Sequence, residues 1–374
     1  MNLQTVFKTL HAEGLVESPQ LAEPLGDTSP WFVRVLLGVC GWVGAFLLLL
    51  VVGLMIFGSL QAHQSVLIVI GALLAGAGLA LGRTNNGALG SQFALALGLA
   101  GQMALLIGLG ESTQAEPLLM AVFAVLVAAP LFWWHPDGVY RFFCALVVCA
   151  AWSVFVTTLG ITPHDVGYGR WGRTFDALSM PGAAASLLAL LPIALGSTAL
   201  WLRRRDWLGT PASARLEPLA WASTLALAWH IGFTGWNWFR LSGLMDVQIW
   251  TLHIGTALAV AAALMYAGWQ LTRAARPTTR ASTLGTLALI AVLAAPAPGL
   301  TAGMLLLGLG FHAGSRVLLG AATLFLLGYG SNWYYALSLD LLSKSLVLMG
   351  TGLLMLMLAW LLRRLPLQET VDAK

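Results

Sequence analysis

Long apolar stretches, separated by short polar loops, run through almost the whole chain. A helix needs about 20 apolar residues to cross a membrane, and most of these stretches approach or exceed that length. The pattern predicts an all-α protein, a polytopic bundle of transmembrane helices with about 12 spans. The predicted spans are residues 35–58, 62–82, 88–109, 117–134, 139–159, 181–202, 216–235, 248–271, 281–297, 299–313, 316–329 and 339–362.

Two of the predicted spans, residues 299–313 and 316–329, are shorter than the usual range of about 17 to 25 residues. They can form thin spans or a re-entrant pair. A re-entrant pair would leave 10 spans and would not change the side on which any other loop lies.

The residues before the first span have a different pattern. Apolar residues such as Leu3 and Phe7 recur at approximately helical spacing, and a segment rich in Pro, Asp, Ser and Thr follows. No early apolar core with a cleavage pattern is present, so we expect the first span to direct insertion. The predicted parts are a cytoplasmic amphipathic helix and linker at 1–34, a transmembrane domain at 35–364 and a cytoplasmic tail at 365–374.

Basic residues indicate the orientation, because cytoplasmic loops of membrane proteins carry an excess of Lys and Arg. The chain has 19 Lys and Arg against 15 Asp and Glu. With the N-terminus inside, all the basic residues but Arg170, Arg173, Arg240 and Lys344 fall on the inner side. The sequence therefore predicts that both termini are cytoplasmic.

Composition agrees with a membrane class: 59% of residues are hydrophobic and 9% are charged, and the mean hydropathy is +0.83. Soluble domains carry roughly 25% charged residues. The basic residues lie mostly in loops as topology signals, so we expect no nucleic-acid partner. The three cysteines lie in apolar runs, which gives no disulfide framework or thiolate metal site.

No established catalytic motif occurs in the chain. It lacks a phosphate-binding loop, a zinc-protease helix, a nucleophile elbow and a haem attachment motif. We therefore predict no catalytic residue and no cofactor. An enzyme stays open only if its groups converge from several loops.

The predicted outer loops differ from the inner ones, which are short, arginine-bearing and otherwise plain. Residues 160–180, 236–247 and 330–338 combine aromatic with ionisable side chains. Arginine beside aromatic faces suits an anionic or sugar-bearing ligand, or an acidic segment of a partner protein. The predicted binding residues are Arg170, Trp171, Arg173, Trp236, Trp238, Arg240, Trp333, Tyr334, Tyr335, Asp340 and Lys344.

Simpler readings exist for parts of this outer face. Trp and Tyr favour both membrane interfaces, so an aromatic belt explains much of the pattern, although not the basic residues on the disfavoured side. Asp340 and Lys344 are four residues apart with the acid first, which is the favoured order for a pair on a helix. Such a pair needs no binding role.

His230 and His253 lie at a similar predicted depth in consecutive spans. They are weak candidates for a metal site, because no third ligand has credible spacing and catalytic zinc usually takes three protein ligands. Polar contacts between helices are the alternative that we favour, and no metal is predicted.

The C-terminal hairpin contains LLGYG, then NWYYALS and LSKS, and ends at Arg363 and Arg364. In these features the chain resembles the family catalogued as domain of unknown function 4401. The resemblance implies a bacterial multi-pass inner-membrane protein with no established activity, encoded beside a small membrane-anchored protein with a GDYXXLXY motif. Most of the match is carried by Tyr334, Tyr335, Leu341, Leu342, Lys344 and Ser345.

Our leading hypothesis is a non-enzymatic binding or scaffold protein that engages this membrane-anchored partner through its periplasmic face. The alternative is a transporter or a protein that handles lipids or glycans, which requires a polar cavity near the membrane midplane. The 41 glycines favour tight packing between helices and leave the oligomeric state open.

Overall fold

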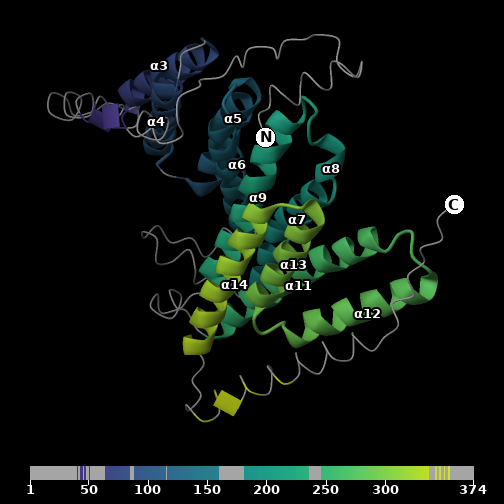
Figure 1. The fold of residues 1–374 in the computed structure, drawn as a ribbon. Coiled ribbons are helices and arrows are strands. Elements are labelled where there is room, and N and C mark those ends of the chain that lie inside the picture. Colours follow the sequence, from purple (N-terminus) through teal and green to yellow (C-terminus); the bar gives the residue numbers. More distant parts are fainter. Residues whose placement is uncertain are drawn as a thin grey trace, which may run out of the picture. The chain divides into compact units, whose positions relative to one another are not determined.

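The computed structural model describes residues 64–84, 88–114, 116–159, 181–235 and 246–336, with isolated positions near both ends of the chain. In these segments the regular structure is helical throughout (Figure 1). Each predicted apolar run that falls in them coincides with a helix. The helices are α3 (Gln64–Arg83), α4 (Ala88–Ser112), α5 (Pro117–Trp134), α6 (Gly138–Leu159), α7 (Pro181–Leu202), α8 (Arg204–Trp207), α9 (Ser213–Gly235), α11 (Asp246–Leu271), α12 (Pro277–Leu293), α13 (Pro298–Ala313) and α14 (Arg316–Ala336).

Among the described residues, 6 helices are long and apolar enough to cross a membrane. They are α3, α4, α5, α6, α7 and α11, and α13 is a shorter apolar helix. The chain thus has transmembrane character. The predicted terminal parts, residues 1–34 and 365–374, lie outside the described residues, as do most of the predicted spans 35–58 and 339–362.

The chain divides into two compact units, Met1–Leu227 and Ala228–Lys374, and the boundary falls within α9. In the first unit, α3 and α4 form a hairpin in which the two backbones meet. A Cβ added at Gly101 would lie 2.2 Å from the backbone N of Ala75, and one at Gly71 would lie 2.5 Å from that of Leu105. Only glycine permits such an approach, which is a common way to pack helices in lipid.

The core of the first unit joins α4, α5 and α6. Leu95, Ala128, Tyr140 and Cys144 form a fully buried cluster, and larger apolar side chains pack around it. α6 in turn packs against α7. A polar contact then links α7 to α9, because the hydroxyl of Thr224 lies 2.9 Å from that of Ser197 and accepts a 2.8 Å hydrogen bond from the Trp201 indole.

The second unit contains the hairpin of α13 and α14. α13 ends at Gly314 in the left-handed conformation (φ 64°), and the N–H of Ser315 donates to the carbonyl of Gly310 at 3.0 Å. Because the turn is tight, α14 begins at Arg316, two residues after Gly314. Along the hairpin, a Cβ at Gly299 would lie 2.3 Å from the ring of Tyr329, so the aromatic ring packs directly on the α13 backbone.

The predicted boundaries of two helices in this unit, α12 and α14, were wrong, and α12 ends at Leu293 rather than at residue 297. α14 has 21 residues and continues through Trp333 to Ala336, whereas the sequence predicted a short span followed by a loop at 330–338. Hydropathy falls where the polar residues begin, but the helix ends only where its backbone hydrogen bonds stop. α12 begins at Pro277 rather than at residue 281, because proline is well suited to the first turn of a helix.

Replacing Gly101 by alanine should destabilise the protein, since its Cβ would overlap the backbone of α3. Overpacking of this kind costs about 1–3 kcal/mol. We expect a lower midpoint of thermal unfolding in detergent. Gly76→Ala is the matched control, because nothing lies within 4 Å of the added Cβ. Equal stability of the two variants would contradict the close approach of α3 and α4.

Candidate functional site

The short connector between α5 and α6 gathers buried polar side chains at one end of the first unit. α5 ends at Trp134, and His135 follows in an extended conformation. Asp137 then starts α6: its Oδ1 accepts hydrogen bonds from the backbone N–H groups of Val139 (2.8 Å) and Tyr140 (3.0 Å). Asp is a preferred residue at a helix N-terminus for this reason. Three residues therefore suffice to turn the chain.

His135 is almost completely buried, with 1% of its surface exposed. Its Nδ1 accepts a 3.1 Å hydrogen bond from the backbone N–H of Asp137, and its ring stacks on Tyr140 with centroids 4.0 Å apart. An accepting Nδ1 places the proton of the neutral ring on Nε2. This Nε2 is buried without a hydrogen-bond partner, and it faces Gly82 of α3, where an added Cβ would lie 3.4 Å away.

The charge state of His135 follows from this burial. Removal from water lowers the pKa of the imidazole, and this effect outweighs the nearby Asp137 carboxylate, which raises it. The guanidinium groups of Arg141 and Arg83 lower the pKa further. The ring is therefore held neutral, as its hydrogen bond to Asp137 requires.

From His135, a row of polar groups continues along the contact between α4 and α6. The hydroxyl of Tyr140 donates to the carbonyl of Gly98 at 3.3 Å, and the ring lies directly on that glycine. One turn further along both helices, the thiol of Cys144 lies 3.5 Å from Oε1 of Gln102. Gln102 is 2% exposed and its Nε2 has no hydrogen-bond partner. Such a row can hold the helices in register.

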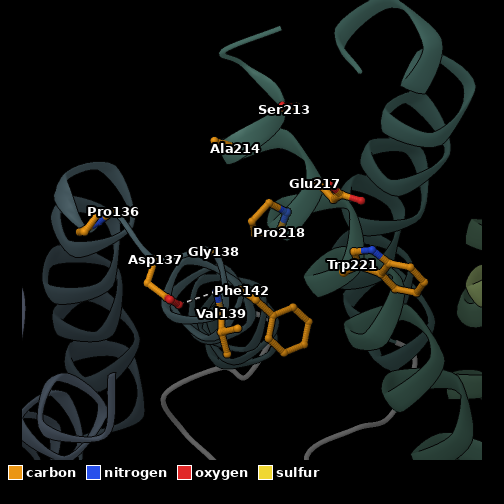
Figure 2. Close-up of a pocket in the computed structure, with 10 residues that line it drawn as sticks. All are labelled: Pro136, Asp137, Gly138, Val139, Phe142, Ser213, Ala214, Glu217, Pro218 and Trp221. Carbon is orange, nitrogen blue, oxygen red and sulfur yellow. Dashed lines mark hydrogen bonds between the residues drawn. The ribbon is translucent and has the colours of Figure 1, made fainter. Parts of the chain in front are cut away.

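Arg141 connects the start of α6 to the start of α9. It is 8% exposed, and its guanidinium donates a 2.8 Å hydrogen bond to the carbonyl of Ala214. Beside this contact lies an open hollow of about 640 Å³ between the two helices (Figure 2). Its lining is mostly apolar and consists of Pro136, Asp137, Gly138, Val139, Phe142, Ser213, Ala214, Glu217, Pro218 and Trp221.

Further arginines surround this end of the unit. The guanidinium of Arg215 lies 4.2 Å above the ring of Trp133, and that of Arg83 reaches the carbonyl of Trp134 at 3.5 Å. Arg204 lies 3.7 Å from the carboxylate of Glu217. The site thus combines arginines held at helix ends with an apolar hollow.

Residues 30–365 match the model of a family described as Domain of unknown function (DUF4401). The chain belongs to this family. The match confirms the resemblance found in the C-terminal hairpin, and it covers all the described helices of the DUF4401 chain. The family's function is unknown, so membership assigns no role to a residue. Neither the curated proteins nor the solved structures contain a match to the chain.

Most of the predicted outer site lies outside the described residues of the DUF4401 chain. This applies to Arg170, Trp171, Arg173, Trp236, Trp238, Arg240, Asp340 and Lys344. The remaining three residues lie on the last turns of α14 rather than in a loop. Tyr335 is 79% exposed, and its ring meets that of Tyr334 edge to face with centroids 5.5 Å apart. Trp333 is half-buried.

The two histidines considered as weak metal candidates lie on separate helices, His230 on α9 and His253 on α11, and both are partly buried. Within the described segments, no three or more His, Cys, Asp or Glu side chains gather in a way that could hold a metal ion.

Sequence reasoning missed the connector site, because it treated the predicted inner loops as plain. A signal was present: His135 follows two tryptophans and precedes Pro-Asp-Gly, a turn sequence whose Asp can begin a helix. What the sequence could not show is that the neighbouring glycines leave room for the histidine to be buried.

The buried neutral state of His135 predicts a loss of stability in acid. In the unfolded chain His titrates near pH 6.5, and the lowered pKa in the fold means that the unfolded state takes up the proton first as pH falls. Stability should therefore decline below about pH 6.5. His135→Asn keeps an acceptor for the Asp137 N–H but does not titrate, so its thermal midpoint should depend less on pH.

His312→Asn, which changes a partly buried histidine of the other unit, is the control for replacing a histidine away from the connector. Thermal unfolding of the three proteins between pH 7.5 and 5 provides the comparison. A His135→Asn profile parallel to that of the parent would contradict the assigned protonation state.

Proposed function

We propose that the DUF4401 chain is a multi-pass protein of the bacterial inner membrane with 12 spans and both termini in the cytoplasm. Support comes from the agreement between the predicted runs and helices α3–α7, α9 and α11–α14. In length alone, the 21 residues of α14 suit a full span better than a re-entrant segment, because they extend about 31 Å at 1.5 Å per residue. The predicted runs at 35–58 and 339–362 complete the count.

Reporter fusions test this topology. Fusions after Thr210 and Thr278 should show cytoplasmic activity, and fusions after Arg170 and Ser242 should show periplasmic activity, because the proposed spans alternate between these points. Alkaline phosphatase and a fluorescent protein that matures only in the cytoplasm give opposite readouts at each position. Inversion at any one of the four would require a different number of spans.

Within this topology, we propose that the chain acts as a non-enzymatic binding or scaffold component, with its periplasmic face docked on a membrane-anchored partner. The observation that carries the proposal is the end of α14, where Tyr335 is 79% exposed beside Tyr334 and the half-buried Trp333. Aromatic side chains dominate the binding energy of protein interfaces. On a helix they are positioned before binding, which reduces the entropy lost on docking.

The expected partner is the small membrane-anchored protein with the GDYXXLXY motif that the family resemblance implies. Anchoring in the same membrane raises the local concentration of the partner, so a modest surface suffices for association. The charged and aromatic residues predicted on the other outer loops, such as Arg170 and Trp236, would extend this surface beyond α14. Their arginines suit acidic side chains of a partner.

Co-purification of the full-length chain with this partner tests the docking face. Trp333→Ala combined with Tyr335→Ala should reduce recovery of the partner strongly, since loss of interface hot spots costs about 2 kcal/mol or more. Phe311→Ala is the matched control: this ring of α13 is 81% exposed in the same unit but lies outside the proposed face. Undiminished recovery with the double variant would overturn the proposal.

A further inference from the structure

Arginines are concentrated around the start of α6 and α9, in a group that the proposed docking face does not use. We call Arg83, Arg141, Arg204 and Arg215 the arginine cluster. Arg215 lies over Trp133 and Arg83 reaches the carbonyl of Trp134, so both meet the end of α5. Arg141 donates a hydrogen bond to the carbonyl of Ala214, the residue before Arg215, which places these two cations near one another. Arg203 and Arg205 flank Arg204 in the sequence and add to the positive charge of this region.

The carboxylates in this region, Asp137, Asp206 and Glu217, neutralise the cluster only in part. Asp137 accepts two backbone hydrogen bonds at the start of α6, and Glu217 lies beside Arg204. Arg83 and Arg215 are exposed at the surface. Arg141 is 8% exposed and its Nε has no hydrogen-bond partner, which is unusual for a buried charged group. An excess of positive charge therefore remains at this end of the first unit, where Arg83 and Arg215 are exposed and Arg141 is buried.

The surroundings of the cluster indicate the kind of anion. Trp133 and Trp134 are 56% and 58% exposed on the last turn of an apolar helix long enough to cross a membrane. Tryptophan at the end of such a helix prefers the level of the lipid headgroups. Arg215, 4.2 Å above Trp133, is thereby held at headgroup level.

We propose that the arginine cluster binds the phosphate of an acidic phospholipid. The planar guanidinium group matches phosphate oxygens through paired hydrogen bonds, and basic pockets between transmembrane helices are suited to such headgroups. The adjoining hollow between α6 and α9 supplies an apolar wall for an acyl chain, formed by Val139, Phe142 and Trp221. The lipid is selected by its charge and not by its tail.

The test uses the purified full-length chain in detergent, to which phosphatidylglycerol or phosphatidylcholine with the same acyl chains is added. Native mass spectrometry should show preferential retention of phosphatidylglycerol, and the midpoint of thermal unfolding should rise with this lipid alone. Arg83→Gln combined with Arg215→Gln should reduce the bound fraction about tenfold, because two phosphate contacts are lost. Arg215→Lys keeps the charge without the paired geometry and should retain part of the binding.

Arg280→Gln is the matched control, because Arg280 also stacks on a tryptophan, Trp269 at 3.1 Å, but belongs to the other unit. It should leave lipid retention unchanged. Equal binding of the two lipids by the parent protein, or an equal loss in Arg280→Gln, would overturn the proposal. Displacement of the lipid by inorganic phosphate at equal concentration would also overturn it, since the site would then take a free anion. The parental lipid preference is measured whether or not the variants fold.

Discussion

Hydrocarbon offers a polar group no hydrogen-bond partner, and this constraint governs where polar chemistry occurs in the chain. Within the apolar helices, hydroxyls return to their own backbone: Thr198 donates to the carbonyl of Ala194 at 2.7 Å, and Thr224 to that of Ala220 at 2.8 Å. The Trp201 indole, buried completely, is satisfied only because Thr224 lies opposite it. Charged side chains are therefore found at the helix ends, where the arginine cluster and the α5–α6 connector lie.

In hydrocarbon, close packing is the main interaction that holds the helices together, because lipid tails are as apolar as leucine side chains. Glycine serves this packing in two ways. In the α3–α4 hairpin it brings two backbones together at Gly71 and Gly101, and elsewhere it admits an aromatic ring, as Gly98 does for Tyr140. The second use creates the candidate site. With a larger residue at Gly98, Tyr140 could not lie beneath His135, and the row of polar groups toward Gln102 would be broken.

Helix identity was predictable from sequence, and some boundaries were predicted to the residue. α5 and α7 match residues 117–134 and 181–202, because a proline opens each helix and polar or charged residues follow its apolar run. α14 was misjudged where polar and aromatic residues continue a helix beyond its apolar part. The connector site escaped prediction for a different reason. Burial of His135 and Arg141 depends on contacts with α3 and α9, which lie far away in sequence.

Two arginines of the cluster act on the histidine of the connector, so the protonation of His135 and the charge of the cluster are linked. Arg83 and Arg141 lower the pKa of His135, and both belong to the proposed phosphate site. A bound anion would offset their positive field and so make protonation of the histidine less costly. By reciprocity, a protonated His135 would favour the anion. Because protonation also removes the acceptor for the Asp137 N–H, the start of α6 is the element through which lipid and proton would influence one another.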